Sequence, residues 1–220
     1  MSQSKRIWGW FFYDWACQPF YTLMLTFFFA PYFATVAADY FVASGMEIEA
    51  SKAKAQTMWS ICLSASGLFI GISAPILGAI ADTSGRRMPW IYVFSIMLIV
   101  GALGTWVGVP DGSNLTLMLY FFALGYIGTE FALIFTNAQL TTLGDQNEIG
   151  KISGSGFGFG YLGGVFALAI ALLFLVEQPN GTTFMLGIEP LFGFLNPENM
   201  EGTRFVGPLA AILSLIHISE

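Results

Sequence analysis

The sequence predicts an all-α, polytopic integral membrane protein. Of its 220 residues, 55% are hydrophobic and only 10% are charged, whereas roughly 25% of the residues in a soluble globular domain carry a charge. Two runs, 57–81 and 88–109, contain no Asp, Glu, Lys, Arg or His. Each is longer than the roughly 20 residues that a helix needs to cross about 30 Å of hydrocarbon. Both runs are expected to span a bilayer, so the lipid bilayer is the first expected partner.

The same test predicts three more spans and part of a sixth. The first of them holds a single charge, Asp14, the second holds only Glu130, and the third holds none. The last run is short for a crossing. In chain order these runs are 8–38, 114–143, 152–176 and 205–218.

The segment 177–204 differs from the spans, because it contains four acids and three prolines around an apolar middle. It reads as an outer loop that lies at the membrane interface. We therefore expect one transmembrane domain, 1–220, that stops inside its sixth helix. The residues after about Leu213 do not read as the continuation of that helix and look like a foreign tail.

The basic residues indicate which side of the membrane each loop occupies. Alternating the spans across the bilayer puts five basic residues on one side and three on the other. The larger group is Lys5, Arg6, Arg86, Arg87 and Lys151, and the smaller is Lys52, Lys54 and Arg204. By the positive-inside rule the larger group is cytoplasmic, which places the N-terminus in the cytoplasm.

A charged turn joins runs 57–81 and 88–109. Its glycine permits the positive φ of a tight turn, its arginines can bind lipid phosphates, and its aspartate lies at a helix C-terminus, where a carboxylate is disfavoured. We expect Asp82 to face the positive N-terminus of another helix instead. The alternative is a short turn with positive-inside arginines and no further role. The residues concerned are Gly78, Asp82, Gly85, Arg86 and Arg87.

This turn resembles the G-x-x-x-D-x-x-G-R-R/K signature between the second and third helices of the major facilitator superfamily. Two other stretches, Tyr13 to Ala16 and Ser153 to Gly164, resemble the vacuole effluxer family, which is related to the fungal vacuolar amino-acid effluxer of autophagy. The resemblance departs at Cys17, where that family has Asn. It implies a conformational latch at the charged turn, a fold of two six-helix halves, and a C-terminal half of the same transporter as a missing partner. It also implies a multi-pass protein of the bacterial inner (plasma) membrane.

Glycines recur every four residues in two of the predicted spans. Such spacing lines one helix face and lets another backbone approach closely. No strand precedes the second group and no phosphate-binding lysine follows it, so a nucleotide loop and a cofactor are not expected. In the superfamily these two helices pack against the other half, although packing within this half is the alternative. The glycines are Gly67 and Gly71 in one span and Gly156, Gly160 and Gly164 in the other.

Asp14 and Glu130 are the only acids within predicted spans. A charge at the bilayer centre costs about 2.5 to 3.5 kcal/mol on insertion scales, so each should face a cavity, find a partner or stay protonated. In the superfamily their two helices line one central cavity. We expect a site for a polar or cationic solute and for protons, without a metal, although a locally bonded interfacial acid is the alternative for Asp14. The expected neighbours are Tyr13, Trp15, Gln18, Tyr126 and Asn137.

The expected function is transport of a small solute by alternating access, and the resemblance suggests an amino acid. A sugar-cation symporter and a membrane scaffold without transport are the alternatives. No Ser-His pair, metal-ligand cluster or Gly-flanked catalytic motif lies at membrane depth, so an enzyme is not expected. Nucleic acid is not an expected partner.

Overall fold

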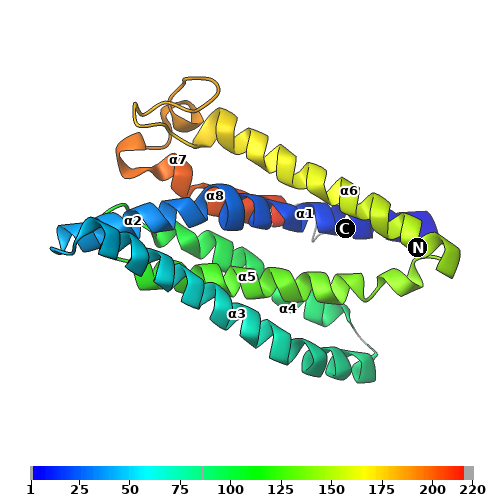
Figure 1. Cartoon of the computed structure of the whole chain (residues 1–220). Coiled ribbons are helices and arrows are strands. Elements are labelled where there is room, and N and C mark those ends of the chain that lie inside the picture. The colour runs from blue at the N-terminus through cyan, green and yellow to red at the C-terminus, as the bar shows by residue number, and fades with distance from the viewer. Residues whose placement is uncertain (1, 86, 216–220) are drawn as a thin grey trace.

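The computed structural model describes residues 2–85 and 87–215, apart from the side chain of Ser84. Within these residues the chain is 82% helical and forms no strand, which confirms the all-α prediction. Five helical segments are long and apolar enough to cross a membrane. They are Gln3–Ala43, Ile48–Thr83, Met88–Val107, Leu115–Thr142 and Gln146–Leu175. Figure 1 shows them as a bundle with α6 along one edge, α3 along the opposite edge, and α1, α8, α5 and α4 between them.

The first span is one helical rod of three parts. Helix α1 (Gln3–Pro19) continues into the π-helix η1 (Phe20–Phe27), and α2 (Phe29–Ala43) follows after a distorted Phe28. The rod extends beyond the predicted run 8–38 at both ends. At its start, Arg6 Nη2 donates to the backbone oxygen of Thr142 at 2.8 Å, so the polar first turn is held against the end of another span.

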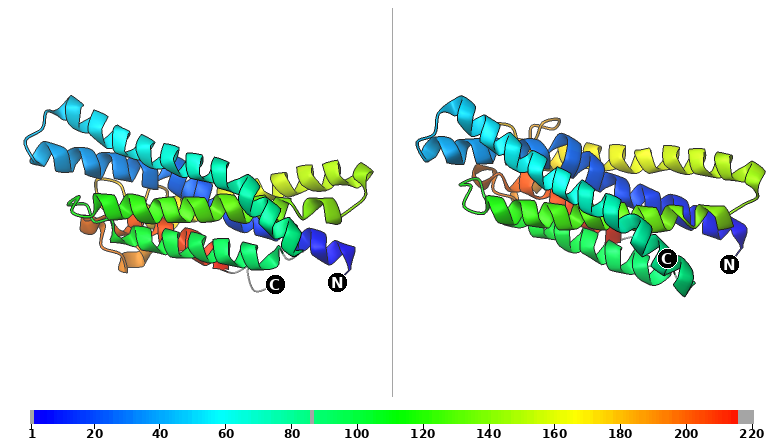
Figure 2. Two further views of the ribbon diagram at one scale, coloured as in Figure 1. Left: turned by 90° about the horizontal axis from the view of Figure 1, so that it is seen from below. Right: turned by 60° about the horizontal axis from the view of Figure 1, so that its bottom comes forward.

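Helix α3 (Ile48–Ser84) is the most exposed span, since only 11% of its most apolar window is buried. It packs against α2 and α5, and in both views of Figure 2, which bring the lower side of Figure 1 forward, it crosses in front of the other helices. An aromatic cluster packs the N-terminal half of α3 against α2 and α5. The Trp59 and Phe122 ring centroids lie 4.5 Å apart, and those of Phe29 and Phe122 lie 5.6 Å apart and stacked. Such pairs add about 0.5 to 1.5 kcal/mol each beyond area burial.

Helices α4 (Met88–Gly104) and α5 (Leu115–Asn137) make the most extensive pair in the fold. The short helix η2 (Thr105–Val107) ends α4, and η3 (Leu140–Thr142) follows α5. Glycines on the facing sides, Gly101 and Gly125, bring the two backbones into direct contact. Close approach of this kind replaces the hydrophobic effect as the driving force between helices in lipid.

Helix α6 (Gln146–Ile170) begins with a capping box in which Asp145 and Glu148 satisfy each other's backbone N–H groups. It continues as the π-helix η4 (Ala171–Leu175) and packs along α1. The end of the chain, α8 (Val206–Leu215), is buried against α4 and α1. The predicted sixth helix, 205–218, agrees with α8 as far as the described residues reach, and residues 216–218 lie outside them.

The segment between α6 and α8 holds three short helices, η5 (Pro190–Gly193), η6 (Pro197–Asn199) and α7 (Glu201–Arg204). Arg204 is only 8% exposed, and its Nη2 donates to the backbone oxygen of Trp106 at 2.6 Å. Glu177 Oε2 accepts the backbone N–H of Thr203 at 2.9 Å. These contacts join the loop to the C-terminal ends of α4 and α6. Meanwhile Phe184 and Phe194 remain exposed.

Candidate functional site

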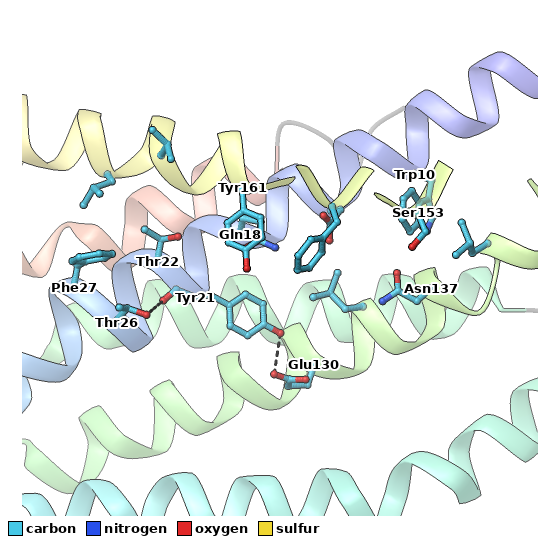
Figure 3. Close-up of a pocket in the computed structure, with 16 residues that line it drawn as sticks. Trp10, Gln18, Tyr21, Thr22, Thr26, Phe27, Glu130, Asn137, Ser153 and Tyr161 are labelled. Atoms are coloured by element: carbon cyan, nitrogen blue, oxygen red, sulfur yellow. Dashed lines mark hydrogen bonds between the residues drawn. The ribbon is translucent and has the colours of Figure 1, made fainter. Parts of the chain in front are cut away.

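A cavity of about 950 Å³ opens between the first, fourth and fifth spans. Figure 3 shows side chains from α1, η1, α5 and α6 around it. Both intramembrane acids line this cavity, and so do two of their predicted neighbours, Gln18 and Asn137. The lining residues are Trp10, Asp14, Gln18, Tyr21, Thr22, Thr26, Phe27, Glu130, Leu133, Asn137, Leu140, Ser153, Phe157, Tyr161, Val165 and Leu168.

The π-helix η1 positions one wall of the cavity. It begins directly after Pro19, which has no N–H to donate to the helix. The wider turn is visible in the backbone, because Phe28 N donates to the backbone oxygen of Leu23, five residues earlier, at 3.0 Å. From this segment the Tyr21 hydroxyl donates to Glu130 Oε1 at 2.9 Å (Figure 3). Segments of π-helix inside α-helices occur frequently at functional sites.

Asp14 lies deeper in the wall and is 7% exposed. Its Oδ2 is buried and has no hydrogen-bond partner among the described residues. The carboxylate packs directly against the backbone of α6 at Gly160, where any side chain would collide with it. A buried polar atom without a partner costs free energy. Asp14 Oδ2 therefore needs a hydrogen-bond donor that the described residues do not supply.

Two further glycines on this face of α6 make the same kind of contact. Gly156 meets the ring of Trp10, and Gly164 meets Thr22 Oγ1. This face of α6 therefore packs against α1 and η1 of the same chain. The expectation that it awaits the missing half is wrong, because the large side chains of α1 fill the space that these glycines leave.

Helix α3 behaves differently. A Cβ atom built on Gly67, Gly71 or Gly78 would meet no described heavy atom within 4 Å. The neighbouring side chains of Leu68 and Ile72 are 66% and 60% exposed. This glycine face is therefore uncovered in the part of the chain that the structure describes.

Three predicted neighbours of the acids do not line the cavity. The Tyr13 hydroxyl lies 2.6 Å from Ser95 Oγ on α4, and the Trp15 ring packs on Phe166 with centroids 5.6 Å apart. Successive residues of a helix point about 100° apart, so Tyr13 faces α4, and Trp15 packs on α6 beside the cavity and not into it. Tyr126 lies one turn before Glu130, but its ring stacks on Phe122, in the core.

The cavity wall also contains polar residues that the sequence interpretation missed. Thr22 and Thr26 follow Asp14 and Gln18 at intervals of four residues. Four polar side chains at this spacing, in an otherwise apolar run, lie on one helix face. That stripe, with Pro19 inside it, was the available signal for this wall.

The charged turn between α3 and α4 is held by hydrogen bonds of its own residues. Gly85 has a φ of 63°, and Arg87 Nη2 donates to Asp82 Oδ1 at 2.7 Å. Arg87 Nη1 also donates to the backbone oxygen of Ala138, at the C-terminal end of α5, at 2.6 Å. The expectation that Asp82 faces the N-terminus of a separate helix is corrected in one respect: its partner is Arg87, just before α4. Arg86 lies outside the described residues.

The fold and the cavity together define a polytopic membrane protein with a polar cavity between its helices. The chain is 27% identical over 176 residues to the uncharacterized MFS-type transporter YxiO of Bacillus subtilis strain 168. The aligned region covers 79% of this chain and 39% of that protein, so the chain spans less than half the length of this relative. No protein-family model and no solved structure matches the chain. The similarity supports the major facilitator superfamily for this chain.

Proposed function

We propose that this chain forms the first half of a transmembrane transporter that moves a small solute by alternating access. One observation carries the proposal: Asp14 and Glu130 come from different spans and line the same cavity. Acids at membrane depth are costly and rare, and they commonly mark solute or ion pathways. The similarity to an MFS-type transporter supports the same conclusion.

The second wall of the pathway belongs, in this proposal, to a C-terminal half. The relative is much longer than the region that aligns with this chain. In the proposed transporter, the spans of the C-terminal half cover the exposed face of α3 at Gly67 and Gly71. The turn that contains Gly78, Asp82 and Arg87 is the proposed latch between the two halves at the cytoplasmic side of a plasma membrane. Its hydrogen bond to Ala138 connects it to the span that carries Glu130.

The solute is proposed to be an amino acid, and protons the coupling ion. Support for the amino acid comes from the Tyr13 to Ala16 and Ser153 to Gly164 stretches, which are similar to the vacuole effluxer family. Support for protons comes from the position of Glu130 in a membrane span, because acids within spans form proton relays in transporters.

The test is uptake by the full-length protein in proteoliposomes under an imposed pH gradient. Glu130→Gln keeps the size of the side chain and an oxygen that accepts the Tyr21 hydroxyl, but it removes the titrating group. We expect it to abolish gradient-driven accumulation at an unchanged level of folded, inserted protein. Glu198→Gln changes an exposed acid in the loop and should have no effect. Undiminished pH-dependent accumulation by Glu130→Gln would contradict the proposed coupling role.

A further inference from the structure

We propose that the cavity selects its solute by a positively charged group, so that its ligand is an organic cation: an ammonium group on an apolar or aromatic body. The proposal rests on the transport function proposed above and specifies the chemistry that the same cavity recognises. An amino acid shares the ammonium group, but the proposal makes that group, and not the carboxylate, the feature that is read.

The charged residues that line the cavity are all acidic among those that the structure describes. Asp14 and Glu130 are both part of its wall, and among the described lining residues there is no Lys, Arg or His. A carboxylate pair without a basic partner repels anions and attracts cations. An ammonium group in the cavity neutralises one of the two carboxylates and lowers the net negative charge of the wall.

The hydrogen bonds around the two acids leave room for a donor. A carboxylate has about four lone-pair sites. Glu130 Oε1 receives the Tyr21 hydroxyl, whereas Asp14 Oδ2 is buried and receives no donor from the described residues. An ammonium group brings three donors and no acceptor, which matches an unpartnered, buried acceptor on a side chain that is 7% exposed.

The rest of the wall suits an apolar body and not a bare metal ion. Beyond the acids, most of the lining is aromatic or aliphatic, including Trp10, Phe157 and Tyr161. Aromatic faces attract cations by about 0.5 to 2 kcal/mol each. A cavity of about 950 Å³ also falls within the roughly 300 to 1,000 Å³ of sites that bind small organic molecules.

The experiment compares matched ligands on the full-length protein in lipid nanodiscs. Phenethylamine is a cation at neutral pH, and 3-phenylpropanamide has the same aromatic body with a neutral amide. We expect phenethylamine to bind at least about tenfold more tightly, which is the ratio that one or two charge-assisted hydrogen bonds provide. This comparison needs no variant, so a folding defect cannot obscure it.

Two variants then locate the cation. Asp14→Asn and Glu130→Gln keep the shapes of the side chains, and each should weaken phenethylamine binding about 10- to 100-fold while leaving the amide within about twofold. The matched controls are Asp39→Asn, an exposed acid farther along the same helical rod, and Glu198→Gln in the loop. Both controls should bind as the parent does.

Several results would overturn the proposal. They are equal binding of cation and amide, no binding of phenethylamine by the parent, an unchanged cation preference in both acid variants, and displacement of phenethylamine by Na⁺ or K⁺ alone at similar concentration. Uptake assays in proteoliposomes separate this proposal from the transport function. Uptake without preference for the cation refutes the ligand class and leaves transport standing, whereas acid-dependent cation binding without any uptake supports the ligand class and refutes transport.

Discussion

Gly128 is a point at which a single methyl group should disturb the fold measurably. It lies buried in α5, facing α4. A Cβ atom there would stand 2.5 Å from the backbone nitrogen of Leu98 and 2.8 Å from the backbone oxygen of Phe94. Ordinary van der Waals contact begins at 3.4 Å, so the two helices would have to separate by nearly 1 Å. No change of rotamer can relieve the contact, because both opposing atoms belong to the backbone.

The size of the effect follows from two opposing contributions. Overpacking of this kind costs about 1 to 3 kcal/mol, and alanine regains up to about 1 kcal/mol of helix propensity over glycine. Gly128→Ala should therefore lower the free energy of unfolding by about 1 to 2 kcal/mol. Since Glu130 is two residues away on the same helix, transport should also fall.

The assay is unfolding of the full-length protein in mixed micelles as the SDS fraction rises. Gly150→Ala is the matched control, because a Cβ on this exposed residue of α6 would meet no described heavy atom within 4 Å. It should leave stability unchanged or raise it by up to about 1 kcal/mol. If Gly128→Ala proves as stable as Gly150→Ala, the close approach of α4 and α5 is wrong.

Three further predictions concern the cavity, the outer loop and the orientation. Tyr21→Phe removes the donor to Glu130 and should slow uptake about tenfold. Tyr120→Phe, at an exposed position of α5 outside the cavity wall, should not, and equal rates for the two variants would exclude a role for the Tyr21–Glu130 hydrogen bond. Burial raises the pKa of the Glu177 carboxyl above its ordinary value of 4.5. The folded protein therefore binds a proton at Glu177 more tightly than the unfolded chain does. The stability that the protonated carboxyl contributes is lost as the pH rises through the raised pKa. Glu177→Gln should therefore flatten the decline of the melting temperature with rising pH, and an unaltered profile would contradict this. In a cysteine-free background, Asn147→Cys should react only with a thiol reagent admitted from the cytoplasm and Ser113→Cys only with one admitted from outside, and the reverse pattern would invert the proposed topology.

The spans were predictable because hydropathy over about 20 residues is a strong signal, but their ends were not. Helix α3 begins at Ile48, nine residues before the predicted run 57–81. The added residues include Lys52 and Lys54, which are good helix formers and carry no hydropathy signal. A helix can continue into water or headgroups as long as its backbone is satisfied, so composition marks the apolar crossing and not the helix.

The two acids of the candidate site could be predicted from the sequence, but the position of Tyr21 in the cavity wall could not. Asp14 and Glu130 stood out because charge is rare and costly in a span. Tyr21, which donates to Glu130, is placed by a π-helix after Pro19, and an extra residue in a turn changes which side chains share a face. A pattern read with 3.6 residues per turn cannot anticipate that change.

The two glycine faces show why sequence spacing alone does not identify a partner. Gly67 and Gly71 are spaced like Gly156 and Gly160, yet among the described residues only the second pair is covered. The difference lies on the opposing helix, because α1 presents the ring of Trp10 and the carboxylate of Asp14 to α6. That contact also explains why Asp14 is held without a partner: the glycine backbone leaves room for the carboxylate, while its own N–H groups are already used within α6. Buried polar atoms in packed interiors otherwise have hydrogen-bond partners, whereas Asp14 Oδ2 has none among the described residues. Such a violation is expected where a ligand completes the interaction, and this makes Asp14 as well as Glu130 a test of what the cavity binds.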